Sequence, residues 1–272
     1  MHGVVSRYCQ ASVFGALLVI FCCSSVFANE GLHNGWDKLL KKHVVASKEG
    51  YDTRVDYAGF IEDKASLQAY LAELAAVTQE NYRGWSAHQQ LAFLINAYNA
   101  HTVALVIEHY ADIDSIRDIG GFFSSPWSKK IAPLLGEVRT LDEIEHDMIR
   151  SDKGFNEPRI HFAVNCASIG CPALRRQAYR GDVLETQLAE QTRLFLSDPS
   201  RNRFAEGKLL VSKIFNWYED DFEQWRGLSG LRAFLAQYAQ ALSLNNADAN
   251  RLRDGEIPIT FLDYDWSLNE VR

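Results

Sequence analysis

The stretch LAFLINAYNAHTVALVIEHY, residues 91–110, is apolar on nearly every side when it is drawn as a helix. Ser86 precedes it and Gln89 follows three residues later, which is the capping-box pattern of a helix start. A helix that is apolar around its whole circumference is typical of the interior of a domain. The stretch therefore predicts a buried central helix that begins after Ser86.

This predicted helix also carries two amides, Asn96 and Asn99. Residues three apart lie on one face of a helix, so the two side chains should lie side by side. A buried amide without a partner costs about 1–3 kcal/mol, so both must find hydrogen bonds. They could bond to the backbone of a neighbouring segment, as most buried polar groups do, or they could line a substrate site.

The flanking sequence predicts further helices and a few strands. Apolar residues recur at helical spacing near Trp36 and near Leu67, and Thr140 forms a second capping box with Glu143. Strands are expected at residues 159–166 and 208–212, with a hairpin turning near Gly136. Helices dominate this pattern. The expected fold class is therefore α+β: a mostly helical single domain, residues 29–272, around the buried central helix with a small β-sheet.

The first 28 residues resemble a secretory signal peptide. An apolar run spans residues 13–23, and Val26-Phe27-Ala28 places small residues where a signal peptidase reads. The run is shorter than the roughly 20 residues that a membrane span needs. We therefore expect cleavage after Ala28 and a periplasmic or secreted protein.

Composition narrows the possible partners. The chain has a formal net charge of −7 and no run of basic residues, which argues against nucleic acid and against anionic lipid. We expect no membrane insertion after signal cleavage. The expected partner is a small-molecule or peptide substrate, or another protein of the cell envelope.

The segment IHFAVNCASIGCP, residues 160–172, holds the only two cysteines outside the first 23 residues. In an oxidising compartment Cys166 and Cys171 would form a disulfide by default. A zinc site with His161 lacks a fourth ligand, and we expect no metal and no cofactor. The remaining alternative is a reactive Cys166 whose thiolate is supported by a neighbouring imidazole.

The predicted strand at residues 159–166 indicates which side chains could form a reactive-cysteine site. Side chains alternate between faces, so Arg159, His161 and Asn165 share one face, and Cys166 ends the strand. If the chain bends there, the Cys166 sulfur can reach His161. Glu145 lies within the apolar stripe of the helix that follows Thr140, where a carboxylate needs a partner. It is therefore a candidate to orient His161.

Five blocks of the sequence resemble the domain-of-unknown-function family numbered 547, in an exported bacterial member. They are LAFLINAYNAHTV, TLDEIEHDMIR, PRIHFAVNCASIGCPAL, VSKIFNWYEDDF and FLDYDWSLN, and the resemblance runs from about Trp36 to Asn269. It implies a fold family and no established reaction. Six candidate residues fall within the blocks: Asn96, Asn99, Glu145, Arg150, His161 and Cys166.

Two functions from different classes follow from these patterns. The first is a periplasmic cysteine-dependent acyl-transfer enzyme, a hydrolase or transferase acting on peptide, amide or thioester bonds. Its predicted nucleophile is Cys166, its base His161 and its orienting group Glu145, and the expected substrate-binding residues are Asn96, Asn99 and Arg150. The alternative is a non-catalytic periplasmic binding or scaffold protein with a structural Cys166–Cys171 disulfide.

Overall fold

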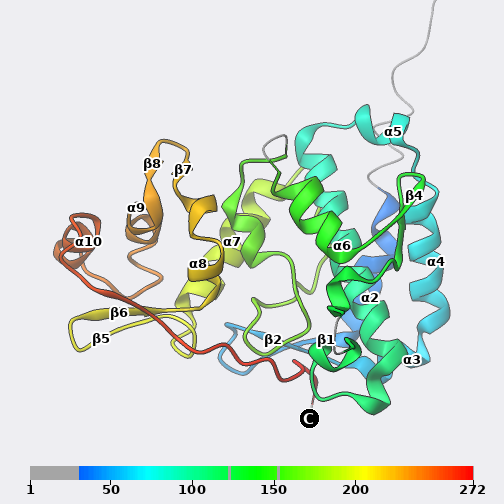
Figure 1. Cartoon of the computed structure of the whole chain (residues 1–272), viewed down its shortest axis with the longest axis horizontal. Coiled ribbons are helices and arrows are strands. Elements are labelled where there is room, and N and C mark those ends of the chain that lie inside the picture. Colours follow the sequence, from blue (N-terminus) through cyan, green and yellow to red (C-terminus); the bar gives the residue numbers. More distant parts are fainter. Residues whose placement is uncertain (1–30, 122–123, 152–153, 272) are drawn as a thin grey trace, which may run out of the picture.

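The computed structural model describes residues 31–121, 124–151 and 154–271. The expected signal peptide, residues 1–28, lies outside this part of the chain. The fold is α+β, as predicted, with more helix than strand. Figure 1 shows most of the longer helices gathered around α6 at one end, and short strands with α9 and α10 at the other end.

Helix α6 (Ala87–His109) confirms the predicted buried central helix. Ser86 accepts a hydrogen bond from the Gln89 backbone N–H, and Gln89 accepts one from the Ser86 backbone N–H, so both halves of the capping box are present. By length and hydropathy the helical stretch Ala87–Asp112 could cross a membrane, but 89% of its most apolar window is buried within the protein. It therefore forms the centre of the larger hydrophobic core.

The N-terminal helices pack around α6. They are α2 (Asn34–His43), α3 (Tyr57–Glu62), α4 (Lys64–Ala75) and the short α5 (Gln79–Arg83). Trp36 of α2 stacks on Tyr70 of α4 with ring centres 5.8 Å apart, and both rings are almost fully buried. The strands β1 (Val44–Ala46) and β2 (Thr53–Val55) form an antiparallel pair beside these helices.

After α6 the chain makes three short 3₁₀ turns, η1 (Tyr110–Asp112), η2 (Ile116–Ile119) and η3 (Pro126–Ser128). The predicted hairpin follows as β3 (Ala132–Leu134) and β4 (Glu137–Arg139), turning at Gly136 with φ +86°. The capping box of Thr140 and Glu143 is present, but the helix that it starts, η4 (Glu143–Ile149), is a π-helix. Such wide turns often occur at functional sites.

The prediction of a strand at residues 159–166 is wrong. The segment Pro158–Phe162 forms the 3₁₀ helix η5. Pro158 has no N–H to give to a sheet and suits the first turn of a helix, and the Glu157 side chain accepts the Arg159 backbone N–H at 3.2 Å. All five residues of η5 are buried. Sequence periodicity does not distinguish a short helix that is buried on every side from a strand that is buried on both faces.

The C-terminal half builds a second core. It contains α7 (Leu184–Ser197), α8 (Ile214–Trp217), η6 (Glu219–Phe222), α9 (Gly230–Gln237) and α10 (Asn246–Arg253). Its sheet has the order β5 (Arg203–Ala205), β6 (Lys208–Val211) and β9 (Ile259–Phe261), and a small pair joins β7 (Gln224–Trp225) to β8 (Leu228–Ser229). Packed phenylalanines fill this second core, among them Phe162, Phe215, Phe222 and Phe234.

The segment after β9 crosses back to the N-terminal half, as its red trace shows in Figure 1. Leu268 pairs with Ser168, and Glu270 pairs with Val55 at the edge of β2. The backbone N–H groups of Ile169 and Gly170 donate to Ser267 and Asp265, each at 2.8 Å. This crossing places the aromatic side chains of the terminal segment beside the two cysteines.

Candidate functional site

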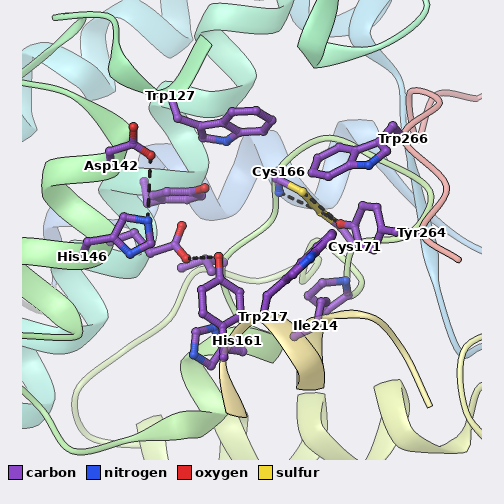
Figure 2. A pocket seen from close by; sticks show the side chains of 15 residues that line it. Trp127, Asp142, His146, His161, Cys166, Cys171, Ile214, Trp217, Tyr264 and Trp266 are labelled. Atoms are coloured by element: carbon purple, nitrogen blue, oxygen red, sulfur yellow. Dashed lines mark hydrogen bonds and ion pairs between the residues drawn. A yellow bond between two sulfur atoms is a disulfide. The ribbon is translucent and has the colours of Figure 1, made fainter. Parts of the chain in front are cut away.

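A cavity of about 270 Å³ lies where the two halves of the molecule meet. Its walls come from α6, η3, η4, η5, the cysteine loop, α8 and the terminal segment. Six of its lining residues carry Trp or Tyr rings: Tyr98, Trp127, Trp217, Tyr218, Tyr264 and Trp266. Figure 2 shows Asp142 and His146 on one side of this cavity and Tyr264 and Trp266 on the other. A mostly apolar cavity with a few convergent polar groups is the usual form of a small-molecule site.

Cys166 and Cys171 both line the cavity and are joined by a disulfide, with their Cα atoms 6.2 Å apart. Cys166 is half-buried, whereas Cys171 is only 3% exposed. Within the loop between them Ala167 adopts φ +62°, a left-handed conformation that side chains rarely take. The Asn165 side chain accepts the Ala167 N–H at 2.9 Å and so supports this turn.

Two hydroxyl groups and one backbone amide surround the disulfide. The Cys166 N–H donates to Cys171 Sγ at 3.0 Å, and the Tyr264 hydroxyl donates to the same sulfur at 3.1 Å. Ser168 in turn donates its hydroxyl proton to the Tyr264 oxygen at 3.1 Å. Burial raises the pKa of the Tyr264 phenol, so this group keeps its proton and acts as a donor. Cys171 Sγ thus has two donors, one of which is polarised by a third group.

The cysteine loop is fixed by amide side chains. Asn99 donates to the Ala163 carbonyl at 3.0 Å and accepts the Asn165 N–H at 2.8 Å. Asn165 donates to the Pro172 carbonyl at 2.8 Å, and the Arg201 guanidinium bonds to the Ile169 carbonyl. These bonds hold both ends and the middle of the loop that carries Cys166 and Cys171.

Asn96 holds a different segment. It donates to the Tyr179 carbonyl at 2.8 Å and accepts the Tyr179 N–H at 2.9 Å. Both asparagines are therefore buried and bonded to backbone outside their own helix. This agrees with the first of the two alternatives for them, and neither residue lies among those that line the cavity.

The structure does not pair His161 with Cys166 or with Glu145. The His161 Nε2 lies 2.6 Å from Oδ2 of Asp221, and its ring stacks on Tyr218 with centres 4.0 Å apart. Burial lowers the pKa of His161, although the hydrogen bond with Asp221 acts to raise it. The expected arrangement of nucleophile, base and orienting group is therefore not assembled in the disulfide form of this site.

Glu145 and Arg150 occupy other positions around Tyr218. Glu145 is 6% exposed, lines the cavity and accepts the Tyr218 hydroxyl at 3.0 Å. The Arg150 Nε lies 2.6 Å from Asp221 Oδ2, and its guanidinium carbon lies 4.5 Å from the Tyr218 ring centre. Arg150 is outside the cavity lining and forms a partly buried cluster with Asp221 and His161.

Four residues of this site were not expected from the sequence: Ser168, Tyr218, Asp221 and Tyr264. Tyr218 and Asp221 lie in the block VSKIFNWYEDDF, and Tyr264 lies in FLDYDWSLN. These blocks were a usable signal, because they are aromatic and acidic stretches far from the cysteines that are part of the family resemblance. Within the described residues, no three His, Cys, Asp or Glu side chains are grouped so that they could hold a metal ion.

The fold and the site define an α+β protein with an aromatic-lined cavity and a cystine in its wall. Residues 82–196 match the model of the family described as "Protein of unknown function, DUF547", which supports the family resemblance seen in the sequence. The match includes α6, Glu145, His161 and both cysteines, and it ends before Tyr218, Asp221 and Tyr264. No curated protein and no solved structure matches the chain.

Proposed function

We propose that this protein carries out thiol–disulfide exchange at the Cys166–Cys171 pair. One observation carries the proposal: both cysteines line the cavity, but Cys171 is buried with two hydrogen-bond donors at its sulfur, whereas Cys166 is only half-buried. In such an exchange the accessible sulfur is attacked and the other sulfur leaves as a thiolate. Donors aimed at the leaving sulfur lower its pKa and favour the reaction.

The reaction needs a thiol as its co-reactant. The thiolate of that thiol attacks Cys166 Sγ, the bond between the protein sulfurs breaks, and Cys171 leaves as a thiolate stabilised by the Cys166 N–H and the Tyr264 hydroxyl. A second thiolate then attacks the substrate sulfur of the mixed disulfide, and Cys166 leaves. Two thiols are oxidised to one disulfide, and the protein disulfide is reduced to two thiols that take up the two protons.

The cysteine-dependent acyl-transfer hypothesis receives less support. It requires a base near Cys166, and the polar neighbours of that sulfur are the Ser168 and Tyr264 hydroxyls, at 3.3 and 3.1 Å. His161 is instead engaged with Asp221. Location in the periplasm, which we propose from the sequence alone, suits exchange chemistry because disulfides persist there.

The test is the redox equilibrium of the native protein. The protein is incubated in glutathione buffers of graded ratio, quenched with acid and alkylated, and the reduced fraction is read by intact mass. We expect the reduction potential of the Cys166–Cys171 pair to lie above about −300 mV. Structural disulfides have potentials below that value and stay oxidised in glutathione buffers. Tyr264→Phe removes one donor from the leaving thiolate and should shift the equilibrium about tenfold toward the disulfide, or ~30 mV.

Tyr238→Phe is the matched control, since Tyr238 packs against the second hydrophobic core and is not in the cavity lining. It should leave the midpoint unchanged. A pair that stays closed in every glutathione buffer, and opens only when the protein is unfolded, would refute the exchange proposal. The disulfide would then be structural, as the alternative of a binding or scaffold protein requires.

A further inference from the structure

The chemistry of the cavity wall indicates which thiol it would accept. We propose that the cavity selects small thiols, or their disulfides, that carry a cationic group such as an ammonium. This inference rests on the exchange function proposed above and assigns its substrate class. It is carried by the combination of carboxyl groups and aromatic rings around the disulfide, together with the absence of any lysine or arginine from the described lining.

The charged part of the wall is acidic. Asp142 and Glu145 are the two acidic residues among the lining residues, and Figure 2 shows Asp142 across the cavity from Tyr264 and Trp266. Of the two lining imidazoles, that of His161 has its pKa lowered by burial, which favours its neutral form, and that of His146 lies 3.9 Å from Asp142. An anionic ligand would meet like charges here, whereas an ammonium group would be attracted.

The opposite wall consists of aromatic rings that can hold a cation over their faces. Trp217, Tyr264 and Trp266 form a cluster with ring centres 4.5–5.7 Å apart, and Trp217 is 43% exposed. A cation within about 6 Å of such a ring centre is attracted by its quadrupole. The guanidinium carbon of Arg117 already lies 5.2 Å from the Trp266 ring centre. This wall therefore already binds one cation of the protein itself.

Cavity size limits the ligand. A volume of about 270 Å³ lies just below the range of roughly 300–1,000 Å³ that is usual for drug-sized ligands. A small aminothiol or a single side chain fits such a space. With its sulfur at Cys166, the ammonium group of this ligand would lie between the carboxyl groups and the aromatic cluster.

The experiment compares three small thiols of different charge as reductants of the Cys166–Cys171 disulfide: cysteamine, 2-mercaptoethanol and thioglycolate. Each rate is divided by the rate of the same thiol with hydroxyethyl disulfide in solution, which cancels intrinsic nucleophilicity. We expect the corrected ratio of cysteamine to thioglycolate to be about tenfold or more, and to fall as salt is added. Glu145→Gln should bring this ratio toward the solution value.

Glu219→Gln removes the same charge one residue from Tyr218, at an exposed position outside the lining, and should leave the ratio as in the unchanged protein. A second measurement needs no sulfur chemistry. Ethylammonium should produce a saturable change in tryptophan fluorescence, since Trp127, Trp217 and Trp266 line the cavity, and the uncharged 1-propanol should not.

The possible failures can be told apart. Equal corrected rates for the three thiols, with no ethylammonium response, would overturn the cation inference and leave the exchange function standing. A disulfide that no thiol reduces, in a protein that still responds to ethylammonium, would overturn the exchange function and keep the cation site. A Glu145→Gln protein that fails to fold changes neither reading, because the charge series on the unchanged protein decides.

Discussion

The Oδ2 of Asp221 lies 2.6 Å from the Nε2 of His161, a residue 60 positions earlier in the chain, and 2.6 Å from the Nε of Arg150. One carboxylate thus joins an imidazole and a guanidinium at the junction of the two halves of the molecule. His161 is only 1% exposed at its side chain, so its orientation depends on this bond and on the Tyr218 ring stacked against it. The cluster therefore holds His161 and Tyr218, which line the cavity, from the side away from it.

Asp221→Asn should destabilise the protein by about 2 kcal/mol, since it weakens charge-assisted bonds to two partly or fully buried partners. The measurement is the midpoint of urea unfolding at neutral pH. Asp220→Asn, which changes an exposed neighbour, should alter the free energy of unfolding by less than about 0.5 kcal/mol. Equal effects of the two substitutions would show that the cluster contributes nothing to stability.

The same carboxylate predicts a loss of stability in strong acid. Burial acts to raise the pKa of Asp221, but the bonds from His161 and Arg150 outweigh it and lower the pKa to about 2. A depressed pKa contributes stability that is present above the unfolded value of about 3.8 and is lost as the pH falls toward 2. In Asp221→Asn the decline of unfolding free energy in this interval should be shallower, because the titrating group is gone.

A separate pH dependence arises from the central helix. His101 is 3% exposed, and its Nε2 has no hydrogen-bond partner in the described part of the chain. Burial lowers its pKa from 6.5 to about 4. His101 therefore binds a proton near pH 6.5 in the unfolded chain but only near pH 4 in the folded chain. The free energy of unfolding falls as the pH drops through this interval, because the unfolded state binds more protons.

His101 lowers the free energy of unfolding by up to about 3 kcal/mol over this interval, at a slope of at most ~1.4 kcal/mol per pH unit. His101→Leu should flatten that slope in urea unfolding measured between these two pH values. Val103→Ala, on the same helix, should lower the free energy of unfolding by an amount that does not change with pH, because it removes no titrating group. A slope unchanged by His101→Leu would mean that this imidazole titrates alike in both states.

Asn99 and Asn96 provide a matched pair that separates stability from site geometry. Each bonds twice to backbone, but only Asn99 bonds to the segment that leads into Cys166. Asn96→Leu and Asn99→Leu should each cost about 1–3 kcal/mol, because each leaves buried backbone groups without a partner. Only Asn99→Leu should also change the rate at which reduced Cys166 is alkylated by iodoacetamide. Identical alkylation rates would mean that Asn99 does not position the cysteine.

Local patterns in the sequence predicted the parts of the fold that depend on local physics. The apolar run after Ser86 and its two amides were interpretable because helix periodicity and the cost of buried polar groups act within a few residues. The contacts of His161 with Asp221 and of Cys171 with Tyr264 span 60 and 93 positions, and no spacing rule reaches that far. The strand prediction for residues 159–166 was wrong for another reason: burial on every side removes the alternation of polar and apolar residues that identifies a strand.

Export remains a prediction, because residues 1–28 lie outside the part of the chain that the structure describes. The apolar run at residues 13–23 and Val26-Phe27-Ala28 predict cleavage after Ala28. Intact-mass analysis of protein from a cell-envelope fraction should give a chain that begins at Asn29. Full-length protein recovered from the cytoplasm would contradict the prediction.

The last prediction concerns the contact between Gly170 and Tyr264. A Cβ atom at Gly170 would lie 2.9 Å from three carbons of the Tyr264 ring, closer than real Cβ contacts come, so the ring must move. Gly170→Ala should therefore withdraw the Tyr264 hydroxyl from Cys171 Sγ. We expect its redox equilibrium to shift toward the disulfide in the same direction as in Tyr264→Phe, by about tenfold, as measured in glutathione buffers.

Gly35→Ala is the control for this substitution, because its Cβ would meet its nearest neighbour, Tyr70 Cβ, at an ordinary 3.8 Å. It should leave the redox midpoint unchanged. The double variant Gly170→Ala, Tyr264→Phe sharpens the test. If the alanine acts only by moving the hydroxyl, the double variant should shift the equilibrium no further than the stronger single variant, since coupled residues are not additive. Additive shifts would mean that Gly170 acts on the cysteine loop by another route, and the position of Tyr264 would not be the cause.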